Sequence, residues 1–243
     1  INSLMLTELA MAIDDVAEDD GMRVLIVTGA GRGFCAGADI NGLVGGEELG
    51  QHTPEHGAEA VRRSFKAVQR VVLGLHHMEK PTIAMVNGVA AGGGFDLACA
   101  CDLRTGCPNT RFVSSFVRLG LFPGYGGTWL YPRVLGSVAK AAEMMFTGDS
   151  MEAEEAEDYG LLNKLVPAEE LEAVTMTMAR KIAAGPPIAI RLSKMLLYKG
   201  LQTDLDTAME MAASAEPITI TSWDHIEGTA AFREKRTARY RGQ

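Results

Sequence analysis

The beginning of the chain combines one helical pattern with several short apolar runs. Apolar residues in Leu4–Val16 recur at the spacing of one helix face, which predicts an amphipathic helix. Arg23–Thr28 and Pro81–Val86 are almost wholly apolar, and such runs are typical of strands buried on both faces. We predict two further short strands at Leu103–Thr105 and Thr110–Val113.

Helical patterns fill most of the remaining sequence. Residues 60–78 are predicted as a helix that follows a loop at 41–58, where Gly, Glu and His are frequent. Residues 90–100 are rich in small side chains and lack proline, which indicates a tightly packed, buried helix whose first turn is glycine. Strand–helix–strand alternation of this kind predicts the α/β class. From Gly126 onward the pattern is helical almost throughout, with breaks at Gly148, Gly160–Pro167, Gly185–Pro187 and Glu216–Pro217.

A change in composition near residue 185 divides the chain. We predict an α/β core over residues 1–185 and a helical region over residues 186–243 that serves in oligomerisation or as a lid. Ile1 is not an initiator residue, and the helical pattern of Leu4–Val16 is already under way there. We therefore expect natural sequence before Ile1.

Charge and cysteine usage exclude several classes of protein. The 243 residues carry a net charge of −8, whereas a nucleic-acid surface needs a basic field. No uninterrupted apolar run approaches the roughly 18 residues that a membrane span requires. The four cysteines form no CxxC pair, so we expect reduced thiols. These features predict a cytoplasmic protein with no nucleic-acid or membrane partner.

A pair of histidines raises the question of a metal site. His52 and His56 are four residues apart, with acidic residues nearby. Pro54 lies between them and disrupts a regular helix, and the stretch has the composition of a loop. We therefore predict no metal.

Two glycine-rich turns carry the candidate chemistry. Gly29–Asp39 follows a predicted strand, but no clear helix comes next and no acidic strand end follows, so a dinucleotide fingerprint is disfavoured. Gly92–Gly94 opens the small-residue helix, where free backbone amides stabilise developing negative charge. A second amide from the first turn would complete an oxyanion hole. The alternative is that these glycines only let the helix approach a neighbouring strand closely.

Five segments, in order along the chain, resemble the crotonase superfamily, the enoyl-CoA hydratase/isomerase family. The resemblance extends from about residue 1 to residue 240. It implies an α/β fold built as a spiral of stacked ββα units with a C-terminal helical region, assembled as trimers or dimers of trimers. It also implies a part in fatty acid metabolism. The segments are Gly33–Ile40, Asn87–Leu97, Pro123–Thr128, Thr147–Pro167 and Glu227–Arg236.

The resemblance also implies roles for individual residues. The N–H groups of Ala38 and Gly93 would hold the thioester oxygen of an acyl-CoA substrate. Coenzyme A would arrive as part of that substrate, with no permanently bound cofactor. Its path would be lined by Ala36, Ala38, Asp39, Ile40 and Asn41, with Phe232 and Lys235 contributed by a neighbouring subunit. The acyl pocket would be lined by Phe116, Pro123, Gly124, Tyr125 and Trp129.

The sequence departs from the family pattern at the acids. By the resemblance, a hydratase has one carboxylate three residues after the middle glycine of the oxyanion turn and another before the pocket turn. Here Asp96 occupies the first position and Phe116 the second. Related isomerases have an acid at the position of Gly124, which is also missing. Asp96 shares a helix face with Gly93, so it could move a proton at a bound thioester. The alternative is that Asp96 only complements the helix dipole.

These residues favour enolate chemistry on an acyl-CoA thioester with one carboxylate as proton shuttle. A double-bond shift suits one base, because the same group can remove a proton and return it elsewhere. Two alternatives stay open. One is an enoyl-CoA hydratase that uses a replacement acid, for which Tyr125 or Tyr131 could supply a hydroxyl. The other is a non-catalytic acyl-CoA-binding protein.

Overall fold

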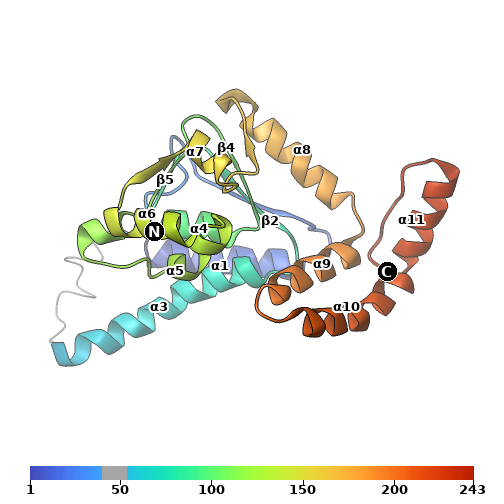
Figure 1. The fold of residues 1–243 in the computed structure, drawn as a ribbon, viewed down its shortest axis with the longest axis horizontal. Coiled ribbons are helices and arrows are strands. Elements are labelled where there is room, and N and C mark those ends of the chain that lie inside the picture. The colour runs from blue at the N-terminus through green and yellow to red at the C-terminus, as the bar shows by residue number, and fades with distance from the viewer. Residues whose placement is uncertain (40–53) are drawn as a thin grey trace.

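Two β-sheets with short strands form the centre of the body (Figure 1), and helices pack around them. The computed structural model describes residues 1–39 and 54–243. The first sheet is parallel and has the order β1 (Leu25–Thr28), β2 (Thr82–Val86), β4 (Leu103–Gly106) and β7 (Lys164–Leu165). In the second, β3 (Val89–Ala91) pairs in parallel with β5 (Arg111–Val113), which pairs antiparallel with β6 (Ser150–Glu152).

Helices cover the sheets and then extend away from them as an arm (Figure 1). The helices of the body are α1 (Ser3–Glu18), α3 (Pro54–His77), α4 (Gly93–Ala100), α5 (Gly127–Val134), α6 (Val138–Thr147), α7 (Ala153–Asp158) and α8 (Leu171–Ala183), with 3-10 turns at Ser115–Leu119 and Ala168–Glu170. The arm consists of α9 (Pro187–Gly200), α10 (Leu205–Ile220) and α11 (Trp223–Glu234).

The predicted strands and the small-residue helix are confirmed. In β2, the middle of the first sheet, Ile83, Ala84 and Val86 have no exposed surface, as expected for a strand covered on both faces. All eight residues of α4 are buried, which is why this helix is made of small and apolar side chains. The α/β class predicted from the alternation therefore holds.

Several boundaries differ from the predictions, each for a local reason. The helix α3 begins at Pro54, six residues early, because proline at a first helical position lacks only an N–H that would be unpaired there. Ala90 and Ala91 belong to a strand rather than to the helix, because Gly92 has φ +52° and separates the two elements. The three-residue strand β6 lies in a stretch predicted as helical, whereas the two-residue strand β7 lies within the predicted break at Gly160–Pro167.

The predicted break at Glu216–Pro217 is wrong. The helix α10 continues through Pro217 to Ile220, and Thr221 N–H still donates to the Pro217 carbonyl at 3.0 Å. A proline near a helix end removes one hydrogen bond without stopping the remaining ones. The chain breaks instead before Leu205 and before Trp223, where Asp204 and Ser222 accept backbone N–H groups as N-caps.

The C-terminal end of α4 is held by a buried cation. Arg104 is 5% exposed, and its guanidinium donates only to backbone carbonyls of the described residues. Two of these acceptors, Ala98 and Cys101, lie at the end of α4, at 3.3 and 2.7 Å. A positive group at this position satisfies free carbonyls and complements the negative end of the helix dipole. A third bond, to the Leu161 carbonyl at 2.7 Å, joins the helix to the segment after α7.

A second polar cluster ties the arm to the body. Asp102, just before β4, accepts from Lys194 Nζ at 2.7 Å and from the Tyr198 hydroxyl at 2.8 Å, both on α9. The same carboxylate accepts the Thr82 N–H at 2.7 Å. The predicted division at residue 185 falls in the connection between α8 and α9, and we retain the two-region description as a proposal.

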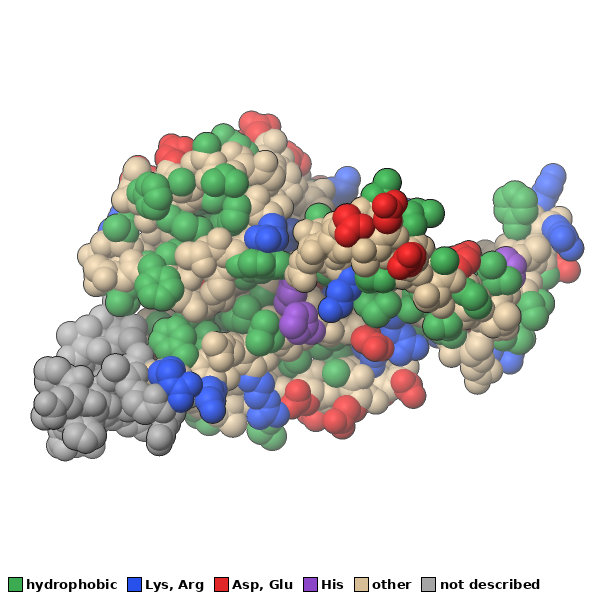
Figure 2. Space-filling view, turned by 60° about the horizontal axis from the view of Figure 1, so that its bottom comes forward, with side chains coloured by type: hydrophobic (Ala, Val, Ile, Leu, Met, Phe, Trp, Pro, Cys, Tyr) green, Lys and Arg blue, Asp and Glu red, His purple; other side chains and the backbone are tan. Residues whose placement is uncertain are grey.

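The arm carries exposed apolar side chains. Figure 2 shows hydrophobic atoms along the helices of this C-terminal part. These side chains are far from buried, and Phe232, the most exposed of them, is 85% exposed. The exposed set on these helices is Met195, Leu197, Leu201, Leu205, Met209, Ile218, Ile220, Ile226 and Phe232. Across residues 1–39 and 54–243, no helix has the combined length and apolar character of a membrane span.

Candidate active site

The two glycine-rich turns lie side by side. Cys35 forms a parallel bridge with Ala90, and the Ala91 N–H donates to the Cys35 carbonyl at 2.9 Å. The first turn thereby runs along β3 and reaches the beginning of α4. A side chain at Gly94 would collide with the Cys35 carbonyl, so close approach does require glycine at that position. The alternative explanation of the glycines is therefore correct for Gly94.

Gly37 brings the two predicted amide donors together. It has φ +95°, and a Cβ on it would lie 2.8 Å from the Ala91 carbonyl and 3.5 Å from the Gly93 nitrogen. Because the Gly37 backbone touches the beginning of α4, the next residue, Ala38, also lies close to the start of this helix. Within the described part of the chain, neither the Ala38 N–H nor the Gly93 N–H donates a hydrogen bond. Two free amides from separate segments are what an oxyanion hole requires.

Aromatic side chains flank this pair of amides. The Phe116 ring lies near Gly92, since a Cβ there would be 3.7 Å from Phe116 Cζ. The Tyr125 ring lies over Gly93, where a Cβ would be 2.8 Å from two of its ring carbons. Tyr125 also packs edge-on against Phe65, with ring centroids 6.0 Å apart. The positions predicted to line an acyl pocket at Phe116 and Tyr125 thus border the oxyanion turn.

Gly124 and Pro123 belong to the same turn. Pro123 is buried, and Gly124 sits so close to Phe65 that a Cβ would be 3.0 Å from its Cε1 atom. A carboxylate side chain at residue 124 would have to displace that ring. The sequence has no acid at this position, and the packing leaves little space for one.

Asp96 is a buried carboxylate without a partner. The residue has no exposed surface, and neither carboxylate oxygen has a hydrogen-bond partner in the described part of the chain. Oδ1 lies 2.5 Å from the position that a Cβ on Gly127 would take, so the carboxylate is under the first turn of α5. Burial raises its pKa from 3.8 to about 7, and the nearby Tyr131 hydroxyl and Tyr125 backbone N–H offset only part of that rise.

The raised pKa of Asp96 bears on its two interpretations, as a proton shuttle or as a charge that complements the helix dipole. A carboxylate that mainly complements a helix dipole would have a lowered pKa, because the dipole favours the charged form. The pKa of Asp96 is raised instead, so loss of hydration outweighs the dipole. Near pH 7 both protonation states are populated, which suits a group that takes up and returns a proton.

The remaining residues predicted for the site differ in how close they lie to the two amides. Trp129 packs against His76, with centroids 5.2 Å apart, and under the Arg133 guanidinium, 4.0 Å away. Phe232 is exposed on α11 and Lys235 directly after it, and α11 lies in the arm, away from the sheets (Figure 1). Ala36 and Asp39 are exposed beside the oxyanion turn. Ile40, Asn41 and His52 are outside the described residues.

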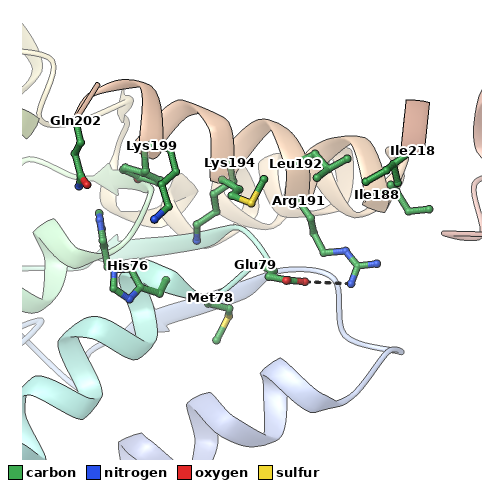
Figure 3. Close-up of a pocket in the computed structure, with 13 residues that line it drawn as sticks. His76, Met78, Glu79, Ile188, Arg191, Leu192, Lys194, Lys199, Gln202 and Ile218 are labelled. Atoms are coloured by element: carbon green, nitrogen blue, oxygen red, sulfur yellow. Dashed lines mark ion pairs between the residues drawn. The ribbon is translucent and has the colours of Figure 1, made fainter. Parts of the chain in front are cut away.

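A cavity of about 460 Å³ lies away from this site, between the end of α3 and α9. Figure 3 shows Arg191 and Lys194 reaching from α9 toward His76 and Glu79, and Arg191 pairs with Glu79 at 3.5 Å. Burial, together with the charges of His77 and Lys194, lowers the pKa of His76. None of the residues predicted for the thioester site lines this cavity. Its position assigns it to the joint between body and arm.

Among the described residues, no group of three or more His, Cys, Asp or Glu side chains could hold a metal ion. All four cysteines are free thiols. Burial raises the pKa values of Cys99 and Cys101 far above the usual thiol range, so neither is a nucleophile.

Comparison with known proteins covers the whole chain. The family model described as Enoyl-CoA hydratase/isomerase matches residues 1–243. The chain belongs to this family. Crotonyl-CoA hydratase from Syntrophomonas wolfei is 38% identical, over 99% of this chain and 88% of that protein. The 1,2-epoxyphenylacetyl-CoA isomerase of Escherichia coli is 36% identical, over 100% of this chain and 90% of that protein.

Solved structures confirm the crotonase-like α/β fold. An enoyl-CoA hydratase from Bacillus anthracis superposes with a TM-score of 0.92 at 36% identity, covering 100% of this chain and 90% of that one. The chain is therefore an enzyme of the enoyl-CoA hydratase/isomerase family that acts on acyl-CoA. The alternative of a non-catalytic acyl-CoA-binding protein loses its support.

The structure places Ser114 close to Tyr131, a proximity that the sequence did not reveal. Ser114 is fully buried between β5 and the 3-10 turn, and its hydroxyl has no hydrogen-bond partner among the described residues. The sequence singled out Tyr131 only as one of two tyrosines that could supply a hydroxyl. A lone serine after a strand gives no signal, because its importance depends on which side chains the fold packs beside it.

Proposed function

We propose that this family member shifts the double bond of an enoyl-CoA thioester through an enolate, with Asp96 as the single proton shuttle. The observation that carries the proposal is the pair of side chains at the acid positions. Asp96 is a buried carboxylate with a pKa of about 7, and the other position holds the Phe116 ring beside Gly92. A phenyl ring cannot transfer a proton, which favours chemistry that runs with one acid–base group.

In this mechanism the Ala38 and Gly93 N–H groups donate to the thioester carbonyl oxygen. Asp96 removes a proton from the carbon next to the carbonyl, and the electrons of that C–H bond move onto the oxygen as an enolate. Removal of one such donor costs about 2.7–4 kcal/mol in comparable sites, so the two amides stabilise the enolate strongly. Asp96 then returns its proton to the carbon two positions further along. The double bond moves into conjugation, and no atom is gained or lost.

The coenzyme A portion would leave the site along the exposed residues Ala36 and Asp39. Phe232 and Lys235 would contact it from a neighbouring subunit, because within one chain they lie far from the oxyanion turn. Coenzyme A belongs to the substrate in this scheme. The chain supplies the binding surface, the two amides and the proton.

A hydratase with a replacement acid is the second candidate. It is favoured by the relatives, since the Syntrophomonas wolfei protein and one from Clostridium acetobutylicum at 36% identity are both named as hydratases. Tyr125 would be the replacement group, because its ring lies directly over Gly93. Burial raises the pKa of Tyr125, which keeps the phenol protonated and able to donate.

A substrate panel separates the two candidates. We expect an unconjugated enoyl-CoA to be isomerised faster than crotonyl-CoA is hydrated, because a missing proton-transfer group typically costs roughly 10²–10⁴-fold in rate. Both reactions are followed by the absorbance of the conjugated thioester, with a dienoyl-CoA as a third substrate. A hydration kcat on the order of 10³ s⁻¹, the upper part of the usual enzyme range, would establish the replacement acid instead. Saturable binding without turnover of any thioester would contradict both.

We also propose that the enzyme assembles as trimers or dimers of trimers. The exposed apolar set on α9, α10 and α11 supports this, since monomers rarely expose so much apolar surface on one arm. An arm that leaves its own body is also suited to packing against another copy. Light scattering should give a mass three or six times that of one chain, and a strict monomer at micromolar concentration would contradict the proposal.

A further inference from the structure

The proposed shuttle Asp96 is close to two other buried polar side chains, and the three come from three different parts of the chain. Asp96 is on α4, Ser114 follows β5, and Tyr131 is on α5. All three are fully buried. The four buried side-chain polar atoms without a partner in the described part of the chain are both Asp96 oxygens, Ser114 Oγ and Tyr131 Oη. Each buried polar atom without a partner destabilises the fold, so four of them in one place require an explanation.

Gly127 fixes how close Asp96 and Tyr131 come. A Cβ on Gly127 would lie 2.5 Å from Asp96 Oδ1 and 2.7 Å from Tyr131 Cζ, the carbon that bears the hydroxyl. These two distances limit the separation of the atoms to 5.2 Å or less. The space between the carboxylate and the phenol is thus kept free by the absence of a side chain at residue 127. The Tyr131 hydroxyl is close enough to the carboxylate to lower the pKa of Asp96 as a hydrogen-bond donor.

The phenol is held rigidly. The Tyr131 ring stacks on Phe95 with centroids 4.1 Å apart and an angle of 21°, and Phe95 in turn contacts Phe112 at 5.1 Å. The Ser114 hydroxyl is close enough to act on the Tyr131 phenol, and although Ser114 precedes a 3-10 turn its side chain does not cap that turn. Burial and the Asp96 charge raise the pKa of Tyr131 well above its usual value, so it remains a donor at every working pH.

We propose that Tyr131, backed by Ser114, is a positioning residue that orients the Asp96 carboxylate and stabilises its ionised form. The inference rests on the proposed role of Asp96 as proton shuttle. In this proposal Tyr131 acts through Asp96 and not on the thioester itself. The functional unit is then a buried Ser114–Tyr131–Asp96 series, in which the phenol donates to the carboxylate and the serine holds the phenol.

The other titratable groups around Asp96 cannot take over this task. They are the Tyr125 phenol and the Cys99 thiol, and both are weak acids whose own pKa values burial raises. No Lys, Arg or His of the described residues contributes to the pKa of Asp96. Tyr131 is therefore the side chain that, together with the Tyr125 backbone N–H, limits how far burial pushes this carboxylate toward its neutral form.

Tyr131→Phe removes the hydroxyl and keeps the ring stack. The pKa of Asp96 should rise by roughly one unit, since a hydrogen bond to a charged group has about that effect on the equilibrium. The acid limb of the kcat profile should move upward by the same amount, so that kcat falls several-fold at pH 7 and recovers near pH 9, with KM little changed. Ser114→Ala should give a smaller shift in the same direction. A ¹³C NMR titration of the Asp96 carboxyl gives the shift without any assay of activity.

Tyr198→Phe is the matched control, because it removes a tyrosine hydroxyl bonded to a different carboxylate, Asp102, outside the site. It should lower stability and leave the pH profile in place. An unshifted profile and an unshifted Asp96 signal in both Tyr131→Phe and Ser114→Ala would overturn the inference. If Asp96→Asn proves fully active, the shuttle itself fails. A dead Asp96→Asn variant with unshifted Tyr131→Phe would leave the shuttle intact and refute only Tyr131.

Discussion

Asp96→Asn should lower kcat on the best substrate by roughly 10²-fold or more while the Kd for the thioester changes little. The amide keeps the shape of the side chain but cannot accept a proton, so every step that passes a proton through residue 96 slows. Steady-state kinetics together with binding of a non-reactive acyl-CoA analogue measure the two quantities separately. Full activity in this variant would remove Asp96 from the mechanism, and the single-shuttle proposal with it.

The same substitution should have a pH-dependent effect on stability. The Asp96 pKa is raised from 3.8 to about 7, so the folded chain binds more protons than the unfolded chain between these values. Wild-type stability therefore falls as pH rises from about 4 to 7, and the asparagine variant lacks this loss. Relative to wild type, the variant should gain free energy of unfolding on going from pH 4 to pH 8.5. Urea denaturation at both pH values tests the sign.

Asp224→Asn provides the opposite case for that measurement. Asp224 is also buried, but its oxygens accept the N–H groups of Arg241 and Gly242 at 2.7 and 2.9 Å. Replacing one of these acceptors by an amide nitrogen should destabilise the fold at pH 8.5. Equal losses of stability in both variants at that pH would contradict the raised pKa of Asp96.

Ala38→Pro should reduce kcat/KM by roughly 10²–10³-fold, because proline has no N–H and removes one of the two oxyanion donors. That loss corresponds to about 2.7–4 kcal/mol of transition-state stabilisation. Ala38→Gly is the control, since it changes the same side chain and retains the amide. The thermal midpoint of both variants establishes that the turn still folds. A folded Ala38→Pro variant with activity within a few-fold of Ala38→Gly would show that this amide is not a donor to the thioester.

The sequence predicted those parts of the fold that local patterns determine. The apolar run of β2 and the small residues of α4 identify buried elements directly. The strands β3, β6 and β7 have two or three residues each, too few for any periodicity, and they exist because partners distant in sequence pair with them. The breaks before Leu205 and Trp223 were not predicted, and the break predicted at Glu216–Pro217 does not occur because α10 continues through Pro217.

The site was likewise predictable in part from local sequence pattern and in part not. Asp96 follows Gly93 by three residues, so the helical repeat alone puts them on one face. The meeting of Ala38 with Gly93 came from family resemblance, because it joins segments more than fifty residues apart. The grouping of Asp96 with Ser114 and Tyr131 follows from neither, since it depends on how α4, α5 and the end of β5 pack.

Arg104 has a consequence for how the enzyme loses activity on heating. Its guanidinium joins the end of α4 to the Leu161 carbonyl after α7, and the helix between Gly93 and Ala100 is buried along its whole length. Local fraying of this helix would expose both the carbonyls that Arg104 binds and the core around the helix. We therefore expect the helix to open only when the whole body unfolds cooperatively. Heat inactivation and global melting would then occur in one transition, and helices of the arm could loosen at lower temperature without displacing the Gly93 amide.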